Sequence, residues 1–187
     1  MNKFVSVIVA AALSFGTIIT PAHANPLWGN VGPWEIRIDT VDNGCFALAS
    51  YERGTIIRLG VDVTRQQVDI YYVNADLKNR VKVGKTYTLR FGFDYQSTSM
   101  EGAMDAIQMN KTIALYNGNV SLEFIKSFAY RNTMQIYAAI DGIWTKIDNV
   151  TLAGTNAALT AVSQCQSEMK ASRQTPNVSE RNQRYYQ

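Results

Sequence analysis

The sequence predicts a mainly β fold: an antiparallel β-sandwich or curled sheet with a short internal helix and a C-terminal helix. Three observations lead to this prediction. Apolar and polar residues alternate through most of residues 34–152, short turn signals separate the alternating segments, and helical spacing of apolar residues appears in two places. Because short turns join successive strands, most of the strand pairing should be antiparallel.

Four alternating segments in the first half of the chain are expected to form a hairpin or meander. In the first segment, Trp34, Ile36 and Ile38 alternate with charged residues, which is typical of a strand with one buried face. The four expected strands span residues 34–39, 44–52, 55–63 and 67–74.

The second half adds more strands and both helices. Residues 85–94 form the clearest strand of the chain, because four large apolar side chains fall on one face. Further strands are expected at residues 103–110 and 112–116, around Met134–Ala138, and at 143–152 after a turn at Asp141-Gly142. The helices are expected at residues 121–131 and 157–170, which gives eight or nine strands and two helices.

The N-terminus has the three parts of a cleavable signal peptide. A positive charge at Lys3 precedes an apolar stretch of about 17 residues, and Ala22-His23-Ala24 supplies small residues for cleavage after Ala24. A retained membrane anchor is the alternative, and the apolar stretch is short for it. We therefore expect a signal peptide at 1–24, one β-rich domain at 25–170 without an integral membrane span, and a disordered polar tail at 171–187.

The two cysteines, Cys45 and Cys165, are expected to form a disulfide. Export would place them in an oxidising compartment, where an even pair is normally bridged. In the chain-entropy model, closing a loop of about 120 residues stabilises the folded state by roughly 4–5 kcal/mol. A redox-active thiol is the alternative, but the chain has no Cys-x-x-Cys motif.

Composition narrows the chemistry that the exported chain can perform. The single histidine, His23, would be lost with the signal peptide, which argues against imidazole-based catalysis and the usual catalytic metal sites. We expect no cofactor and no metal. The formal net charge is +3, but the excess comes from Lys170, Arg173, Arg181 and Arg184 near the C-terminus, so we expect no nucleic-acid partner.

Two segments at the ends of the domain resemble a known family. A strand beginning at Trp34 leads to Gly44-Cys45-Phe46, and residues 150–159 (VTLAGTNAAL) run into a short Ala-rich helix that carries Cys165. These segments are similar to the invasion-associated locus B family and to related small exported proteins of alphaproteobacteria. The resemblance implies a link to host-cell entry, and it implies no catalytic residues.

Aromatic and acidic side chains are the candidate functional groups. Tyr71, Tyr95 and Trp144 are the candidate contact residues for a protein or sugar partner, because they are expected outside the core. Asp62, Asp69 and Asp94 are expected on exposed strand faces, where two of them about 5–9 Å apart could hydrolyse a glycoside. A solvated cross-strand charge ladder is the interpretation we favour for these acids.

Together these observations predict a periplasmic or secreted, non-enzymatic domain that binds another envelope protein or a host protein. An envelope glycan hydrolase that uses the three carboxylates is one alternative. An accessory subunit of a secretion machine is another.

Overall fold

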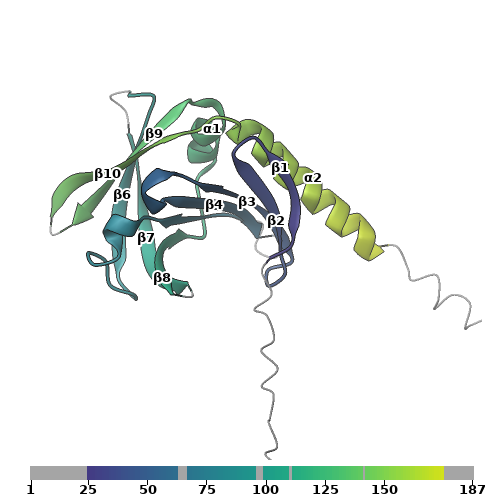
Figure 1. The fold of residues 1–187 in the computed structure, drawn as a ribbon, viewed down its shortest axis with the longest axis horizontal. Helices are drawn as coiled ribbons and strands as arrows, with labels where there is room; N and C mark the ends of the chain where they lie inside the picture. The colour runs from purple at the N-terminus through teal and green to yellow at the C-terminus, as the bar shows by residue number, and fades with distance from the viewer. Residues whose placement is uncertain (1–24, 63–66, 96–98, 110, 141, 175–187) are drawn as a thin grey trace, which may run out of the picture.

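The computed structural model describes residues 25–62, 67–95, 99–109, 111–140 and 142–174 (Figure 1). Its ten strands form one antiparallel sheet in the order β1-β2-β3-β4-β5-β8-β7-β6-β9-β10, and the sheet curls without closing. The predicted mainly β fold with two helices is therefore confirmed. The predicted signal peptide, and the tail beyond Gln174, lie outside the described residues.

The element bounds follow the predicted segments closely. The strands of the first half are β1 Leu27–Val31, β2 Trp34–Asp39, β3 Gly44–Ser50, β4 Ile56–Asp62 and β5 Gln67–Val73. Those of the second half are β6 Thr86–Phe93, β7 Ser99–Met109, β8 Thr112–Asn117, β9 Thr133–Ile140 and β10 Ile143–Thr151. The helices are α1 Leu122–Tyr130 and α2 Thr155–Gln174, and short 3-10 turns occur at Glu52–Gly54 and Ala75–Leu77.

Three features of the fold differ from the prediction. β1 was not expected, because Gly29 and Asn30 lie within it and both residues are depleted in strands. β7 begins at Ser99 rather than at residue 103. α2 spans Thr155–Gln174 rather than 157–170, so residues 171–174 continue the helix.

The apolar core fills the concave side of the curled sheet. Alternate residues of neighbouring strands meet there because the registers place them side by side, as Ile57 faces Ala49 on one side and Tyr72 on the other. Less than 2% of the surface of each of the largest core side chains is exposed: Trp34, Ile36, Ile57, Leu59, Tyr72, Leu89, Met104, Leu115, Phe128, Met134, Ile136 and Val162.

Helix α1 inserts two aromatic rings into this core. Ser121 caps the helix, because its hydroxyl accepts a hydrogen bond from the Phe124 backbone N–H at 3.1 Å. The Phe124 ring lies 5.0 Å from Phe91, and the Phe128 ring lies 5.8 Å from Trp34. The edge-to-face geometry of both pairs is a favourable arrangement for aromatic rings.

Helix α2 packs against β2 and β3 and covers the edge strand β1 (Figure 1). The predicted disulfide joins Cys165 of α2 to Cys45 of β3, with the two Cα atoms 6.2 Å apart. The Cys45 N–H also donates a hydrogen bond to the Gln166 side chain at 2.9 Å. In the described part of the chain, no helix is both long and apolar enough to cross a membrane.

Candidate binding site

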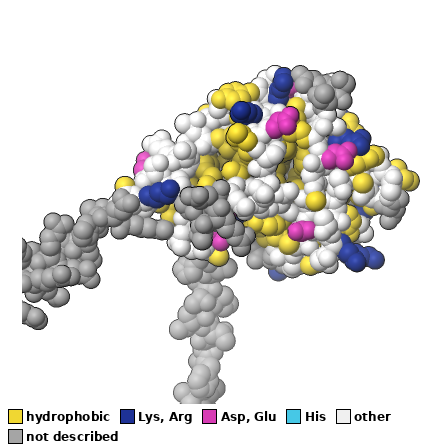
Figure 2. Space-filling model, turned by 180° about the vertical axis from the view of Figure 1, so that it is seen from behind, with side chains coloured by type: hydrophobic (Ala, Val, Ile, Leu, Met, Phe, Trp, Pro, Cys, Tyr) yellow, Lys and Arg dark blue, Asp and Glu magenta, His cyan; other side chains and the backbone are white. Residues whose placement is uncertain are grey.

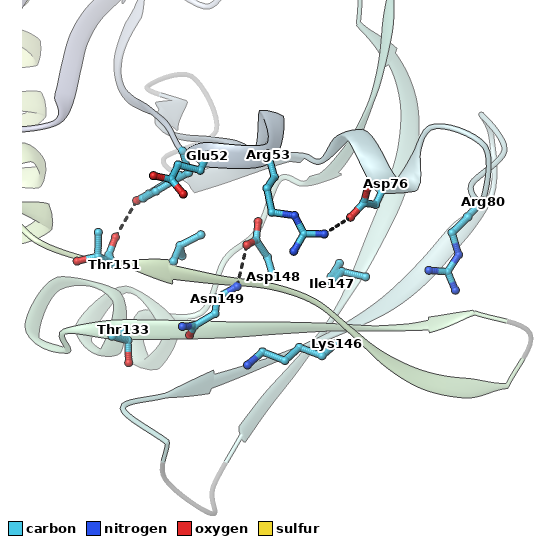
Figure 3. Close-up of a pocket in the computed structure, with 12 residues that line it drawn as sticks. Glu52, Arg53, Asp76, Arg80, Thr133, Lys146, Ile147, Asp148, Asn149 and Thr151 are labelled. Atoms are coloured by element: carbon cyan, nitrogen blue, oxygen red, sulfur yellow. Dashed lines mark hydrogen bonds and ion pairs between the residues drawn. The ribbon is translucent and has the colours of Figure 1, made fainter.

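A polar cleft lies where the curled sheet fails to close. One wall is strand β10, and the other wall is the connection between β3 and β4 together with the turn after β5 (Figure 3). The cleft has a volume of about 720 Å³. We call it the seam cleft. Its lining residues are Tyr51, Glu52, Arg53, Asp76, Arg80, Thr133, Lys146, Ile147, Asp148, Asn149, Val150 and Thr151.

Side-chain hydrogen bonds hold the two walls of the seam cleft together. The Tyr51 hydroxyl donates to the Thr151 carbonyl oxygen at 3.0 Å. The Asp148 carboxylate accepts from the Thr55 hydroxyl and, at 3.3 Å, from the Asn74 side-chain amide. In the described residues β10 has a strand partner on one side, β9, so side chains take the place of a backbone ladder along this seam.

Two tyrosines of this region have perturbed acidity. Burial, and secondarily the negative charge of Asp148, raises the pKa of Tyr51 to about 12. The same two causes raise the pKa of Tyr72 further, since its side chain is fully buried. Both hydroxyls therefore stay protonated at neutral pH, and the Tyr51 hydroxyl remains a hydrogen-bond donor to β10.

The charges of the seam cleft are unevenly distributed along its length. Arg53 and Asp76 neutralise each other in an ion pair of 2.7 Å. In Figure 3, Glu52 lies near Thr151 and Arg80 lies at the opposite end, whereas the Lys146 side chain extends from β10 toward Asn149, away from Arg80. Glu52, Arg80 and Lys146 are exposed, and none forms an ion pair within the described residues. The cleft thus has Glu52 at one end and Arg80 at the other, with the Lys146 ammonium between them.

The predicted contact residue Tyr71 is half-buried on the convex face of the sheet. Its ring lies 4.7 Å from the ring of Tyr116. The Arg58 guanidinium lies 4.4 Å from the Tyr71 ring and 4.3 Å from the Phe46 ring, so it is held between two aromatic side chains. Tyr71 is therefore engaged in a packed cluster rather than displayed on the surface.

The same cluster corrects the expectation for Asp69. Asp69 was expected on an exposed face, but only 5% of its surface is exposed, and its carboxylate lies 3.6 Å from Arg58. Asp39, also buried, forms a second ion pair with Arg58. The two acids surround a shielded arginine because Phe46 and Tyr71 exclude water from it. The side chain of Asp62 lies outside the described residues.

Asp94 is not part of this cluster, because β8 and β7 lie between β5 and β6 in the sheet. Its carboxylate accepts hydrogen bonds from the backbone N–H groups of Asn132, at 2.8 Å, and Thr133, at 2.9 Å. The Thr133 hydrogen bond is the largest cause that lowers the pKa of Asp94. Asp94 thus fastens the end of β6 to the start of β9.

The other two predicted contact residues are at β10, the strand that lines the seam cleft: Trp144 belongs to this strand, and Tyr95 contacts it. Tyr95 is 65% exposed, and its hydroxyl accepts from the Asn149 side chain at 3.2 Å. The Arg90 guanidinium lies 3.9 Å from the Trp144 ring. These two contacts are about 16 Å apart along β10, from the rise per residue of a strand. Tyr71 lies on β5, which four strands separate from β10 in the sheet order, and it is not brought together with them.

Sequence reasoning missed the seam cleft itself. Its lining residues come from the end of the strand expected at 44–52 and the turn after it, from a segment expected to be a loop, from the start of β9, and from the last strand. A periodicity argument assigns no function to turns and loops, and the contact between β10 and Tyr51 depends on how far the whole sheet curls. The sequence offered one indication of the cleft: two adjacent polar residues, Asp148 and Asn149, interrupt the apolar–polar alternation of the last strand.

Comparison with known proteins shows a shared fold. No protein-family model matches the sequence, and no curated protein matches it. Among solved structures, the chain is similar to the crystal structure of invasion associated protein B from Bartonella henselae. The TM-score is 0.56 and the identity 12%, and the match covers 74% of this chain and 97% of the other. The chain therefore shares its fold with a member of the family that its end segments resemble.

Proposed function

We propose that this chain is an exported, non-enzymatic domain that binds a segment of another envelope or host protein in the seam cleft. The observation that carries the proposal is the cleft itself: an open groove of about 720 Å³ along the uncovered edge of the sheet, with exposed charges of both signs at its rim. Concave sites with a few convergent polar groups are where proteins usually bind their ligands.

Two further observations support export and a host-related role. The Cys45–Cys165 disulfide suits the periplasm or the extracellular space, because thiols stay reduced in most cytosolic compartments. The structural neighbour is described as invasion-associated, which supports a role in contact with a host. A periplasmic or secreted location follows from the proposal.

Four buried or hydrogen-bonded acids serve as structural groups in this proposal. Asp148 accepts hydrogen bonds from Thr55, Asn74 and the Asn149 N–H, and Asp76 is paired with Arg53. Asp69 is paired with Arg58, and Asp94 binds backbone N–H groups. A glycosidase needs one carboxyl group in apolar surroundings, to keep it protonated, and a second one about 5–9.5 Å away. The partners of these four carboxylates favour binding over hydrolysis.

Site-specific photo-crosslinking in native cells tests the proposal. We would place a benzophenone amino acid at Arg80 or Lys146 in the cleft, and at Val41 as a control, since Val41 is 83% exposed and lies on the turn between β2 and β3. Both cleft positions should give the same protein adduct, and Val41 should not. Equal labelling from Val41, or no adduct from either cleft position, would contradict the proposal.

A further inference from the structure

We propose that the bound segment is an extended peptide that adds to β10 as an antiparallel strand, with a carboxylate near its C-terminal end facing Arg80. This inference rests on the proposed function and names the kind of partner that the seam cleft takes. Three features carry it: the open hydrogen-bonding edge of β10, the limited length of that edge, and the charge polarity of the cleft.

The backbone geometry shows which groups of β10 face away from β9. The Leu152 N–H donates to the Asn132 carbonyl at 2.7 Å, so Leu152 belongs to a hydrogen-bonded pair of this antiparallel ladder. Hydrogen-bonded and non-hydrogen-bonded pairs alternate along such a ladder, and a bulge interrupts the register at Ile147. The alternation, continued through the bulge, places Lys146 (opposite Tyr137) and Trp144 (opposite Ala139) in non-hydrogen-bonded pairs. Their N–H and C=O groups therefore point to the open edge.

Part of this edge is already occupied. The Thr151 carbonyl accepts from Tyr51, and the Asn149 N–H donates to the Asp148 side chain. No backbone hydrogen bond joins the Trp144–Lys146 edge to another element of the described chain. A peptide can thus form a short series of backbone hydrogen bonds with Trp144–Lys146. The remaining part of the peptide must be held along the cleft by side-chain contacts. This pattern matches strand addition, in which backbone bonds give affinity and side-chain contacts give specificity.

The charges of the cleft select a direction for the peptide. β10 runs from Ile143 to Thr151, so an antiparallel peptide places its C-terminal end near Arg80 and its N-terminal part near Glu52 (Figure 3). A carboxylate at the C-terminal end then meets Arg80, which forms no ion pair within the described residues. A second copy of this chain, paired through the same short edge, would need a two-fold axis near Thr145, which would place the Lys146 side chains of the two copies close to each other.

The space-filling view shows the face of the molecule that is turned away from the viewer in Figure 1. In Figure 2, basic, acidic and apolar side chains are interspersed over that face, without one large area of a single charge.

Proline substitution at the edge tests this inference. Lys146→Pro removes an N–H that points away from β9, so the β9–β10 ladder stays intact, whereas Lys146→Ala removes the charge and keeps the N–H. The probes are three fluorescent nine-residue peptides of alternating valine and threonine. The first has a free C-terminal carboxylate, the second ends in a glutamate with an amidated C-terminus, and the third has an amidated C-terminus and no acidic group. Affinity is measured by fluorescence polarisation with the full mature chain.

We expect both acidic probes to bind and the neutral probe to bind at least about tenfold more weakly. Lys146→Pro should weaken the acidic probes at least about tenfold beyond Lys146→Ala, and Arg80→Ala should weaken only these probes. A difference between the two acidic probes tells a terminal carboxylate from a glutamate side chain. Bound peptide should also slow amide exchange at Trp144 and Lys146.

Equal binding by Lys146→Pro and Lys146→Ala, equal binding by the neutral probe, or no binding at millimolar concentration would overturn strand addition. If Lys146→Pro fails to fold by circular dichroism, Trp144→Pro against Trp144→Ala repeats the comparison at the other outward N–H. A cleft crosslink that survives both proline substitutions would overturn strand addition while leaving the proposed function in place.

Discussion

Gly60 leaves the space that the Asp69 carboxylate occupies. A Cβ atom at position 60 would lie 2.7 Å from Asp69 Oδ1, closer than real Cβ atoms approach oxygen. Because Asp69 is held beside Arg58, a side chain at position 60 must push the carboxylate away from the guanidinium. The glycine therefore permits the buried charge cluster on the convex face.

We expect Gly60→Ala to lower the free energy of unfolding by about 1–3 kcal/mol, measured by urea denaturation. Gly92→Ala on β6 is the matched control, since its Cβ would meet nothing closer than 3.8 Å. Gly92→Ala should leave the free energy of unfolding unchanged or raise it slightly. Equal effects at the two positions would contradict a role for Gly60 in accommodating Asp69.

Asp94 should make the stability depend on pH in the acid range. Its pKa is lowered in the folded state, so the charged form stabilises the fold above the ordinary carboxyl pKa. That contribution is lost as the pH falls through the lowered pKa. We expect Asp94→Asn to lower the melting temperature at pH 7 and to leave it nearly unchanged once the pH is well below the lowered pKa of Asp94. Asp42→Asn, at an exposed turn, should show no such difference; a pH-independent loss in Asp94→Asn would refute the charge effect.

Tyr51 should make the stability of the fold depend on pH in the alkaline range. Its pKa is raised to about 12, so its contribution to stability is complete below pH 10 and is lost as the pH rises toward that value. We expect Tyr51→Phe to cost about 1 kcal/mol at neutral pH, because the bond to Thr151 is lost, and to flatten the alkaline loss. Tyr130→Phe, at a 73% exposed position, should change neither quantity in pH-dependent denaturation.

At the scale of the elements, α1 depends on its N-terminal cap. Ser121→Ala removes the acceptor for the Phe124 N–H and should lower stability by about 1 kcal/mol in chemical denaturation. Ser121→Asp keeps an acceptor and should restore most of the loss. If both variants were equally destabilised, the effect would come from packing and not from the cap.

The elements that alternation defines could be predicted from the sequence, and those that depend on curling could not. Residues 85–94 and 143–152 have clear periodicity, and strands β6 and β10 lie there within a few residues. β1 was missed because Gly29 and Asn30 give it no apolar face, and its pairing with β2 comes from the tertiary structure. The burial of Asp69 was missed because a polar strand position looks the same whether or not aromatic side chains enclose it.

The candidate site depends on still longer-range information. Tyr95 and Trp144 could be identified from the sequence as lying outside the core, and they contact β6 and β10 residues as exposed aromatic side chains do. The seam cleft joins residues 51–53, 76–80 and 146–151. None of these segments has a sequence pattern that indicates a binding site. The cleft can therefore be recognised only when the order and the curl of the ten strands are known.

At the scale of the whole molecule, the Cys45–Cys165 disulfide connects the N-terminal part of the sheet to the last helix. It closes a loop of 120 residues, so its loss should lower the free energy of unfolding by about 4 kcal/mol. We expect that difference between the oxidised chain and the Cys45→Ser/Cys165→Ser variant in guanidinium denaturation. An unchanged midpoint after reduction of the wild-type chain would contradict it.

The junction between β5 and β8 divides the sheet into two groups of strands. Strands β1–β5 follow one another in chain order, and β8, β7, β6, β9 and β10 form the rest of the sheet. The two groups meet through Ile70, Tyr71 and Tyr72 opposite Asn117, Tyr116 and Leu115. Within the described residues this junction has the fewest paired residues in the sheet, so the shared core, in which Trp34 packs against Phe128, holds the two groups together more than the strand ladder does. The hydrogen bonds from Tyr51 to Thr151 and from Thr55 to Asp148 then connect the two groups a second time, at the opposite end of the strand order.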